Sequence, residues 1–214
     1  TLSANTDGIA VRYDNSLQLQ VDEKVSQFSE LSKFVFEFTP YRVLAMKDVN
    51  NYIAVKTDRS LKVKGIYSQL SLKKNPTAQV SSDAVGAWLA NGTEISHTIY
   101  HSPFANFISA RNVTGGGKQE GKYLGKVVRW YQSTESIEPI RYYTNDNKVP
   151  KSDGARACMI VDDFKTHPQD LDYNWYLKEA IKIVVAIGGV KYLTAYELAL
   201  VAPQPKQRKK SNGK

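Results

Sequence analysis

The amino-acid sequence predicts an α+β fold, with antiparallel strands and a packed helix first and a mixed region of helices and strands after them. Short β-prone runs are separated by polar turns, which is typical of antiparallel hairpins. Two longer segments, 16–31 and 170–187, carry apolar residues at helical spacing. A hydrophobic content of 42% over 214 residues is enough to build a globular core.

The composition narrows the possible classes of protein. The net charge of +8 favours a polyanionic partner, and nucleic acid is the commonest one. Cys158 is the single cysteine, so it can form no intrachain disulfide, and we expect it to be a packed small residue. No apolar run approaches the ~18 residues of a membrane span, and no signal-peptide pattern opens the sequence. We therefore expect a cytoplasmic protein without a membrane partner.

Thr1 stands where Met would begin a chain, which suggests a fragment, a processed product or half of a split enzyme.

Residues 1–13 form the first predicted element, a β-hairpin with Asp7 at its tip. The polar turn Asn5-Thr6-Asp7-Gly8 is followed by the β-prone run at 9–13. Two paired strands hold such a carboxylate in a fixed position, as a catalytic metal site needs. Asp-Gly is also a common turn dipeptide, so the spacing alone favours an ordinary turn.

An amphipathic helix is predicted at 16–31, with Asn15 or Ser16 as its N-cap. The aromatic run at 34–38 then predicts a strand, which Pro40 interrupts.

Two strands at 47–56 and 61–67 flank the polar turn 57–60 and predict a second hairpin. Taken in isolation, the lysines of this hairpin favour solubility and protection of the strand edges.

A polar connector broken by Pro76 separates two predicted units, residues 1–72 and 73–200, and a disordered basic tail at 201–214 follows them. Ser82 or Asp83 is the expected cap of the first helix of the second unit. The remaining elements expected there are helices ending at 91, at 93–100, 170–187 and 193–200, and strands at 123–131 and 140–143.

Two patterns that resemble ligand sites do not meet the requirements of those sites. His97 and His101 have the spacing of zinc ligands on a helix, but no third ligand is near, so we expect surface or partly buried histidines. Residues 116–122 fit the start of a phosphate-binding P-loop. Tyr123 replaces the Ser or Thr that would hold magnesium, and a strand follows instead of a helix.

The segment 112–123 instead predicts a flexible basic loop before a strand, with cations and aromatic rings along one surface. Such a surface suits contacts to a nucleic-acid backbone, because cations hold phosphates and glycines let the main chain approach closely. Rings of this kind are more often core residues than stacking platforms. The candidate cations are Arg111, Lys118, Lys122, Lys126 and Arg129, with Lys148 and Lys151 on a second basic loop at 145–156.

Two of these stretches resemble motifs of the family B DNA polymerases. The turn Asn5-Thr6-Asp7-Gly8 is similar to the motif C hairpin, usually Tyr-x-Asp-Thr-Asp-Ser, and the variant Ser-Ala-Asn-Thr-Asp-Gly looks like that of polymerase-like proteins of tailed phages. In this alignment Asp7 matches the second, metal-binding Asp, Asn5 stands at the first, and Gly8 replaces the Ser.

The second hairpin is similar to the family's Lys-Lys-x-Tyr strand and its later Lys-Gly element. Tyr52 matches the Tyr and Lys64-Gly65 match the Lys-Gly, whereas Asn50 stands where the family has a lysine. Lys47 or Lys56 would then have to supply that phosphate contact.

The resemblance implies the C-terminal part of a phage-type DNA polymerase, with the end of the palm at 1–72 and the thumb at 73–200. Asp7 would bind two Mg²⁺ ions, with Asp48 as an additional ligand, and Asn5 and Thr6 would shape the turn. Tyr52 and Lys64 would steady the primer strand of a primer–template, and the basic loops would grip the duplex. The other essential Asp, the dNTP-binding lysine and the exonuclease would lie on an upstream polymerase fragment, so this chain alone is expected not to polymerise.

Two other classes of function stay open at this point. One is a non-catalytic nucleic-acid-binding module, a remnant thumb in which Asn5 marks lost chemistry. The other is a basic structural or interaction domain without a nucleic-acid partner.

Overall fold

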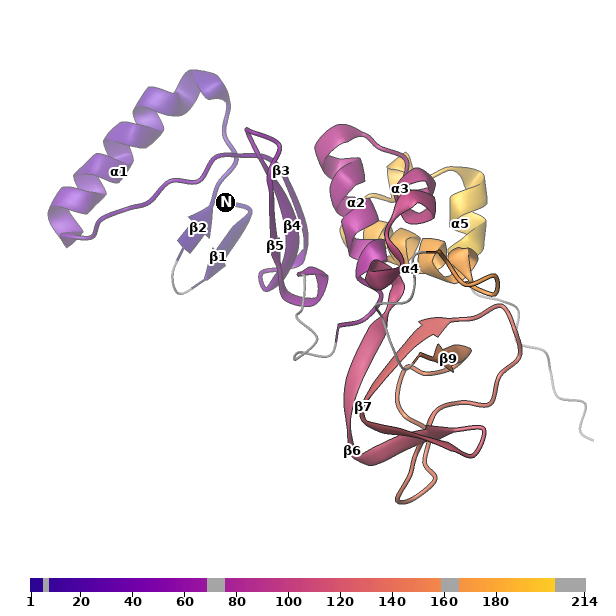
Figure 1. Ribbon diagram of the computed structural model, residues 1–214. Helices are drawn as coiled ribbons and strands as arrows, with labels where there is room; N and C mark the ends of the chain where they lie inside the picture. Colours follow the sequence, from indigo (N-terminus) through magenta and orange to yellow (C-terminus); the bar gives the residue numbers. More distant parts are fainter. Residues whose placement is uncertain (6–7, 69–75, 159–165, 203–214) are drawn as a thin grey trace, which may run out of the picture.

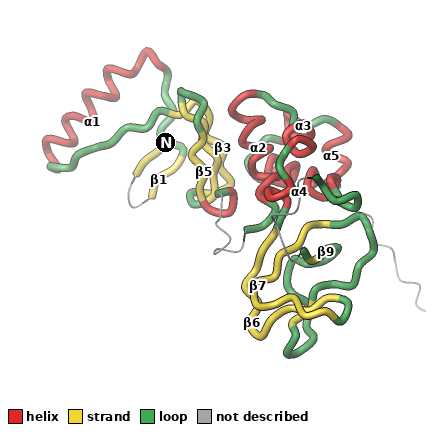
Figure 2. Tube along the Cα trace, in the orientation of Figure 1, coloured by secondary structure: helices red, strands yellow, loops and turns green. Residues whose placement is uncertain are grey.

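The computed structural model describes residues 1–5, 8–68, 76–158 and 166–202, and their fold is mixed α+β as predicted (Figure 1). The described strands form three antiparallel sheets, with the orders β1-β2, β3-β4-β5 and β8-β6-β7-β9 (Figure 2). The strands are β1 (Ser3–Asn5), β2 (Gly8–Ala10), β3 (Tyr41–Asp48), β4 (Asn51–Lys56), β5 (Leu61–Lys64), β6 (Ser109–Gln119), β7 (Lys122–Gln132), β8 (Arg141–Tyr142) and β9 (Ala155–Ala157). The helices are α1 (Gln18–Ser32), α2 (Gln79–Asn91), α3 (Ile95–His101), α4 (Tyr173–Ala186) and α5 (Ala195–Val201), with short 3-10 turns at 15–17, 65–67, 104–107 and 190–192.

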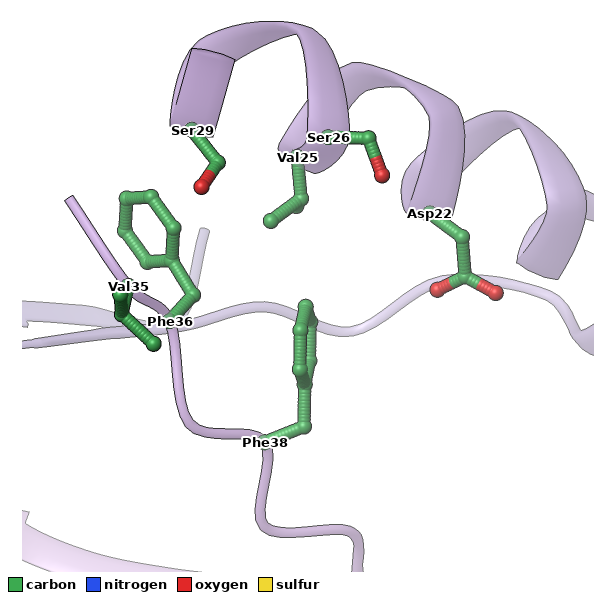
Figure 3. A pocket seen from close by; sticks show the side chains of 7 residues that line it. All are labelled: Asp22, Val25, Ser26, Ser29, Val35, Phe36 and Phe38. Atoms are coloured by element: carbon green, nitrogen blue, oxygen red, sulfur yellow. The ribbon is translucent and has the colours of Figure 1, made fainter. Parts of the chain in front are cut away.

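The N-terminal helix forms where its periodicity predicts, but it is not packed into a core. A 3-10 turn capped by Asp14 leads into α1, and no residue of the helix is buried. The strand expected at 34–38 is absent, because these residues find no strand partner and return along α1 instead (Figure 3). Phe36 contacts Phe28 with the ring centroids 5.7 Å apart. The expectation of a packed helix is therefore wrong for α1.

The three-stranded sheet packs against the C-terminal helices in one hydrophobic core. Ile53 of β4 and Tyr67 lie in the same buried cluster as Val85 of α2 and Ile181 of α4. The guanidinium of Arg42 on β3 also donates a hydrogen bond to the carbonyl of Ala90, at the end of α2. The predicted boundary near residue 72 lies outside the described residues, and the core includes residues from both sides of it.

The first helix of the second unit begins earlier than its predicted cap. α2 starts at Gln79, so Ser82 and Asp83 lie inside the helix. Its preceding residue, Ala78, is held by a hydrogen bond from its N–H to the hydroxyl of Ser109 (3.1 Å). This tertiary contact, rather than a local side-chain cap, sets the helix start. The helix ends at Gly92 in the left-handed conformation, as predicted.

The segment expected to be a flexible loop is part of a long β-hairpin. β6 continues to Gln119 and turns tightly at Glu120-Gly121 into β7, which corrects the loop prediction. The N–H of Ala110, at the start of β6, donates to the Pro76 carbonyl, and the N–H of Gln132, at the end of β7, donates to the hydroxyl of Tyr176 on α4. The turn is therefore the end far from the helices (Figure 1). A second core lies on this sheet, with Val113, Leu124, Val128, Trp130, Ile140, Val149 and Ala155.

The long hairpin is tied to α4 by the carboxylate of Asp170. This carboxylate accepts hydrogen bonds from the Tyr131 hydroxyl (2.9 Å), the Ser133 hydroxyl (2.6 Å) and Nε of Arg156 (2.6 Å). Burial alone would raise the pKa of Asp170, but these three hydrogen bonds and the Arg156 charge outweigh it and lower the pKa. α4 then begins at its cap Asp172, whose side chain accepts from the backbone N–H of Trp175, within the predicted helix 170–187.

Candidate nucleic-acid interface

The N-terminal hairpin forms, and the strands β1 and β2 close on the predicted turn. Asn5 and Gly8 are the last paired residues of the two strands, with Ala4 opposite Ile9. Thr6 and Asp7 lie outside the described residues, so the place of the Asp7 carboxylate stays a prediction. In the described part of the chain this hairpin is a sheet of its own, separate from the sheet that holds Tyr52.

Tyr52 and Lys64, predicted to contact the primer, are brought together by the second hairpin. They are direct cross-strand partners on β4 and β5. Partners in an antiparallel pair project from the same face of the sheet, so the two side chains start from neighbouring positions on that face. Lys64 is exposed and Tyr52 is partly buried, which leaves the cation accessible beside a fixed ring.

Lys62 lies on the same face, although the sequence analysis did not predict it as a site residue. It lies two residues before Lys64 on β5, so both side chains project to one side of the strand. Its ammonium group lies 5.9 Å from the ring centroid of Tyr41, and the hydrogen bond and charge of that phenol raise the pKa of Lys62. The alternation Leu61-Lys62-Val63-Lys64 was the signal that could have revealed it.

Gly65 is required where it stands. The strand expected to run to Tyr67 ends at Lys64 and turns into a 3-10 helix at Gly65, whose φ is +71°. A Cβ added there would lie 2.2 Å from the Asn50 carbonyl oxygen and 2.2 Å from Oδ1 of Asn51. Oδ1 of Asn51 also accepts a hydrogen bond from the backbone N–H of Ile66 (2.9 Å). The turn after Lys64 is thus held against the turn between β3 and β4 by this hydrogen bond and by the close approach at Gly65.

Asp48, the candidate additional metal ligand, organises that same turn. Its carboxylate accepts from the Asn51 amide (2.8 and 2.9 Å) and from the backbone N–H of Asn50 (2.9 Å). The Asn51 and Asn50 hydrogen bonds lower the pKa of Asp48. Across the described residues no group of three or more His, Cys, Asp or Glu is placed to hold a metal ion.

The cations of the long hairpin do not share one surface, contrary to the prediction. Arg111 is opposite Val128, and Arg129 is opposite Ala110. Because consecutive residues of a strand project to opposite faces, Arg111 and Arg129 lie on opposite sides of the ribbon. Arg111 donates to the Pro150 carbonyl (3.2 Å), so it ties the two basic segments together.

The remaining cations fall into two groups. Lys118 pairs with Asp146 (2.8 Å) and Lys148 with Asp153 (2.6 Å). Lys122, Lys126 and Lys151 are exposed, and within the described residues no carboxylate lies within ion-pair distance of them. These three are the cations most available to phosphate.

Trp130, the two histidines and Cys158 occupy ordinary structural positions. Trp130 is buried, so it is a core residue and not a stacking platform. His97 and His101 stack on each other with centroids 4.2 Å apart, and Nδ1 of His101 lies 2.8 Å from the His97 carbonyl oxygen. Cys158 is buried, and burial raises the pKa of its thiol to about 11.

Comparison of the chain with protein-family models, with curated proteins and with solved structures finds no match. In the parts of the chain that the structure describes, no helix is both long and apolar enough to cross a membrane.

Proposed function

We propose that the chain is the C-terminal part of a phage-type family B DNA polymerase, which supplies the motif C carboxylate Asp7 and the surface that holds primer–template DNA. The observation that carries the proposal is the Tyr52–Lys64 pair, since the two residues that the motif resemblance assigns to the primer strand are direct partners across one hairpin. Neighbouring Lys62 adds a second cation to this face. A phosphate backbone is bound mainly by such cations, and a ring beside them fixes its position.

The turn that follows Lys64 supports the same proposal. Gly65 lies against the Asn50 carbonyl, and the Asp48–Asn51–Ile66 hydrogen bonds join the start of β4 to the turn that follows β5. A binding group held by such a network keeps its place without a ligand, and this preorganisation is what a primer-positioning lysine needs. In this proposal Asp48 and Gly65 are positioning residues, and Lys64 contacts the DNA.

The surface of α1 and the segment after it supports the upstream polymerase fragment as a partner. Leu19, Leu31 and Val35 expose 83%, 84% and 97% of their surface. Phe36 and Phe38 extend toward α1 and leave a groove between them and the helix, which is also lined by Asp22, Ser26 and Ser29 (Figure 3). Apolar surface of this extent, concentrated on one segment, marks an interface with another polypeptide.

The test is reconstitution of the chain with the polypeptide encoded upstream of it, followed by primer extension with dNTPs and Mg²⁺. The reconstituted pair should extend the primer, and this chain alone should not. Asp7→Ala should abolish extension while duplex binding is retained, and Glu94→Ala, at the exposed start of α3, is the matched control that should extend normally. Duplex binding without extension in the reconstituted pair would replace the polymerase proposal with a non-catalytic nucleic-acid-binding module.

A further inference from the structure

Two exposed tyrosines and two cations meet on one face of the four-stranded sheet, near the end that is far from the helices. Lys118 of β6 is opposite Tyr123 of β7 on one side and opposite Arg141 of β8 on the other. These three side chains therefore form a row across three strands on the same face. Tyr143 follows Arg141 by two residues, and its N–H donates to the Gly116 carbonyl (2.9 Å). We call Lys118, Tyr123, Arg141 and Tyr143 the distal face.

The two rings of the distal face contact each other at the surface. Their centroids are 5.1 Å apart at an interplanar angle of 74°. Tyr123 lies over Gly116, where a Cβ would come within 2.3 Å of the ring carbon Cε2. Tyr123 and Tyr143 nevertheless expose 48% and 57% of their surface, and neither belongs to the core of this sheet. Packing of the sheet therefore does not account for these rings.

The cations beside the rings are paired with carboxylates that a phosphate can replace. Lys118 pairs with the Asp146 carboxylate (2.8 Å). Arg141 lies 3.7 Å from Glu138 and also donates to the exposed carbonyl of Asp146 (2.8 Å). The side chains of Asp146 and Glu138 are 64% and 53% exposed. Ion pairs at such exposure contribute little stability, so exchange of the partner costs little. Both cations can turn to a phosphate that passes the rings.

We propose that the distal face binds single-stranded DNA, with bases stacked on Tyr123 and Tyr143 and the backbone phosphates on Lys118 and Arg141. Flat rings next to cations are the usual means of binding single strands without sequence preference, because every base has a π-face. The inference rests on the proposed function, and it assigns a single-stranded segment of the template to the end of the thumb. Duplex contacts are assigned to the Tyr52–Lys64 face.

Removal of the Asp146 charge should change DNA affinity in the direction opposite to truncation of the rings. Asp146 competes with phosphate for Lys118, so removal of its charge should strengthen the binding of DNA. Truncation of either ring should weaken that binding. A surface that merely attracts DNA through its net charge would respond to Asp146 but not to the rings.

The test measures fluorescence anisotropy of a labelled twelve-nucleotide oligo(dT) and of a blunt duplex with the full chain. Tyr123→Ala and Tyr143→Ala should each weaken oligo(dT) binding by about fivefold to a hundredfold and leave duplex binding unchanged. Tyr123→Phe should bind like the parent chain, because stacking needs the ring and not the hydroxyl. Tyr196→Ala is the matched control, since Tyr196 is 64% exposed on α5, at the helical end of the molecule. Asp146→Asn should tighten oligo(dT) binding.

Four outcomes separate the two proposals. If the chain binds duplex but not oligo(dT), or if the two alanine variants match Tyr196→Ala, the distal face is refuted and the proposed function stands. Equal loss of duplex and oligo(dT) binding in Tyr123→Ala also refutes it. If the chain binds neither DNA at low salt, the proposed function itself fails.

Discussion

Substitution of Gly65 by alanine tests whether the turn after Lys64 is locked as the structure shows. Two effects of the added Cβ can be separated. An alanine at φ +71° adopts the left-handed region, which costs about 1 to 2 kcal/mol. The Cβ would also lie 2.2 Å from Oδ1 of Asn51, so Asn51 must move and lose its hydrogen bond from Ile66, which costs about 1 kcal/mol more. We expect Gly65→Ala to lower the free energy of unfolding by about 2 to 3 kcal/mol.

Gly92 provides the matched control for this substitution. Its φ is +74°, nearly that of Gly65, but a Cβ there would meet no atom within 4 Å. Gly92→Ala should therefore lower the free energy of unfolding only by the backbone cost, about 1 to 2 kcal/mol.

Urea unfolding monitored by circular dichroism measures the free energy of unfolding of both variants. The three-stranded sheet and the helices share one core and should unfold together. Equal losses in the two variants would refute the steric lock at Gly65. A Gly65→Ala variant as stable as the parent chain would refute both the turn and its role in holding Lys64.

Three further predictions concern the DNA contact, the ion network and the thiol. Lys64→Ala should weaken duplex binding for all sequences, and the slope of log K against log salt should fall in magnitude by about 0.9, measured by anisotropy at several salt concentrations. Because the pKa of Asp170 is lowered in the folded chain, its stabilising contribution is complete above about pH 4 and is lost as the pH falls through the folded pKa. Asp170→Asn should therefore be less stable at neutral pH and should flatten this acid-side decline in urea unfolding. Cys158, buried and with a raised pKa, should react with iodoacetamide at pH 8 only after unfolding.

The elements that the sequence predicted well are those whose signals are local. α4 follows from apolar periodicity together with the cap Asp172, and both act within one helix. The β4–β5 hairpin follows from two β-prone runs around a polar turn, and its register placed Tyr52 opposite Lys64.

The elements that the sequence missed depend on distant partners. Residues 34–38 are strand-like in composition, but a strand needs a neighbour, and their contacts are with α1. Glycines at 115–117 suggested a loop, yet β6 runs through them, with Gly115 and Gly116 at a register shift and Gly117 paired with both β7 and β8. The separation of Arg111 from Arg129 required the register of the hairpin, which no composition reveals.

The measurement that most directly tests the primer-holding surface is the affinity of the chain for a primer–template with a recessed 3′ end, compared with a blunt duplex of equal length. The account predicts tighter binding of the recessed end, and loss of that preference in Tyr52→Ala while the affinity for the blunt duplex stays the same. Equal affinity for the two DNAs, unchanged by Tyr52→Ala, would contradict a polymerase primer site and leave a general nucleic-acid-binding protein.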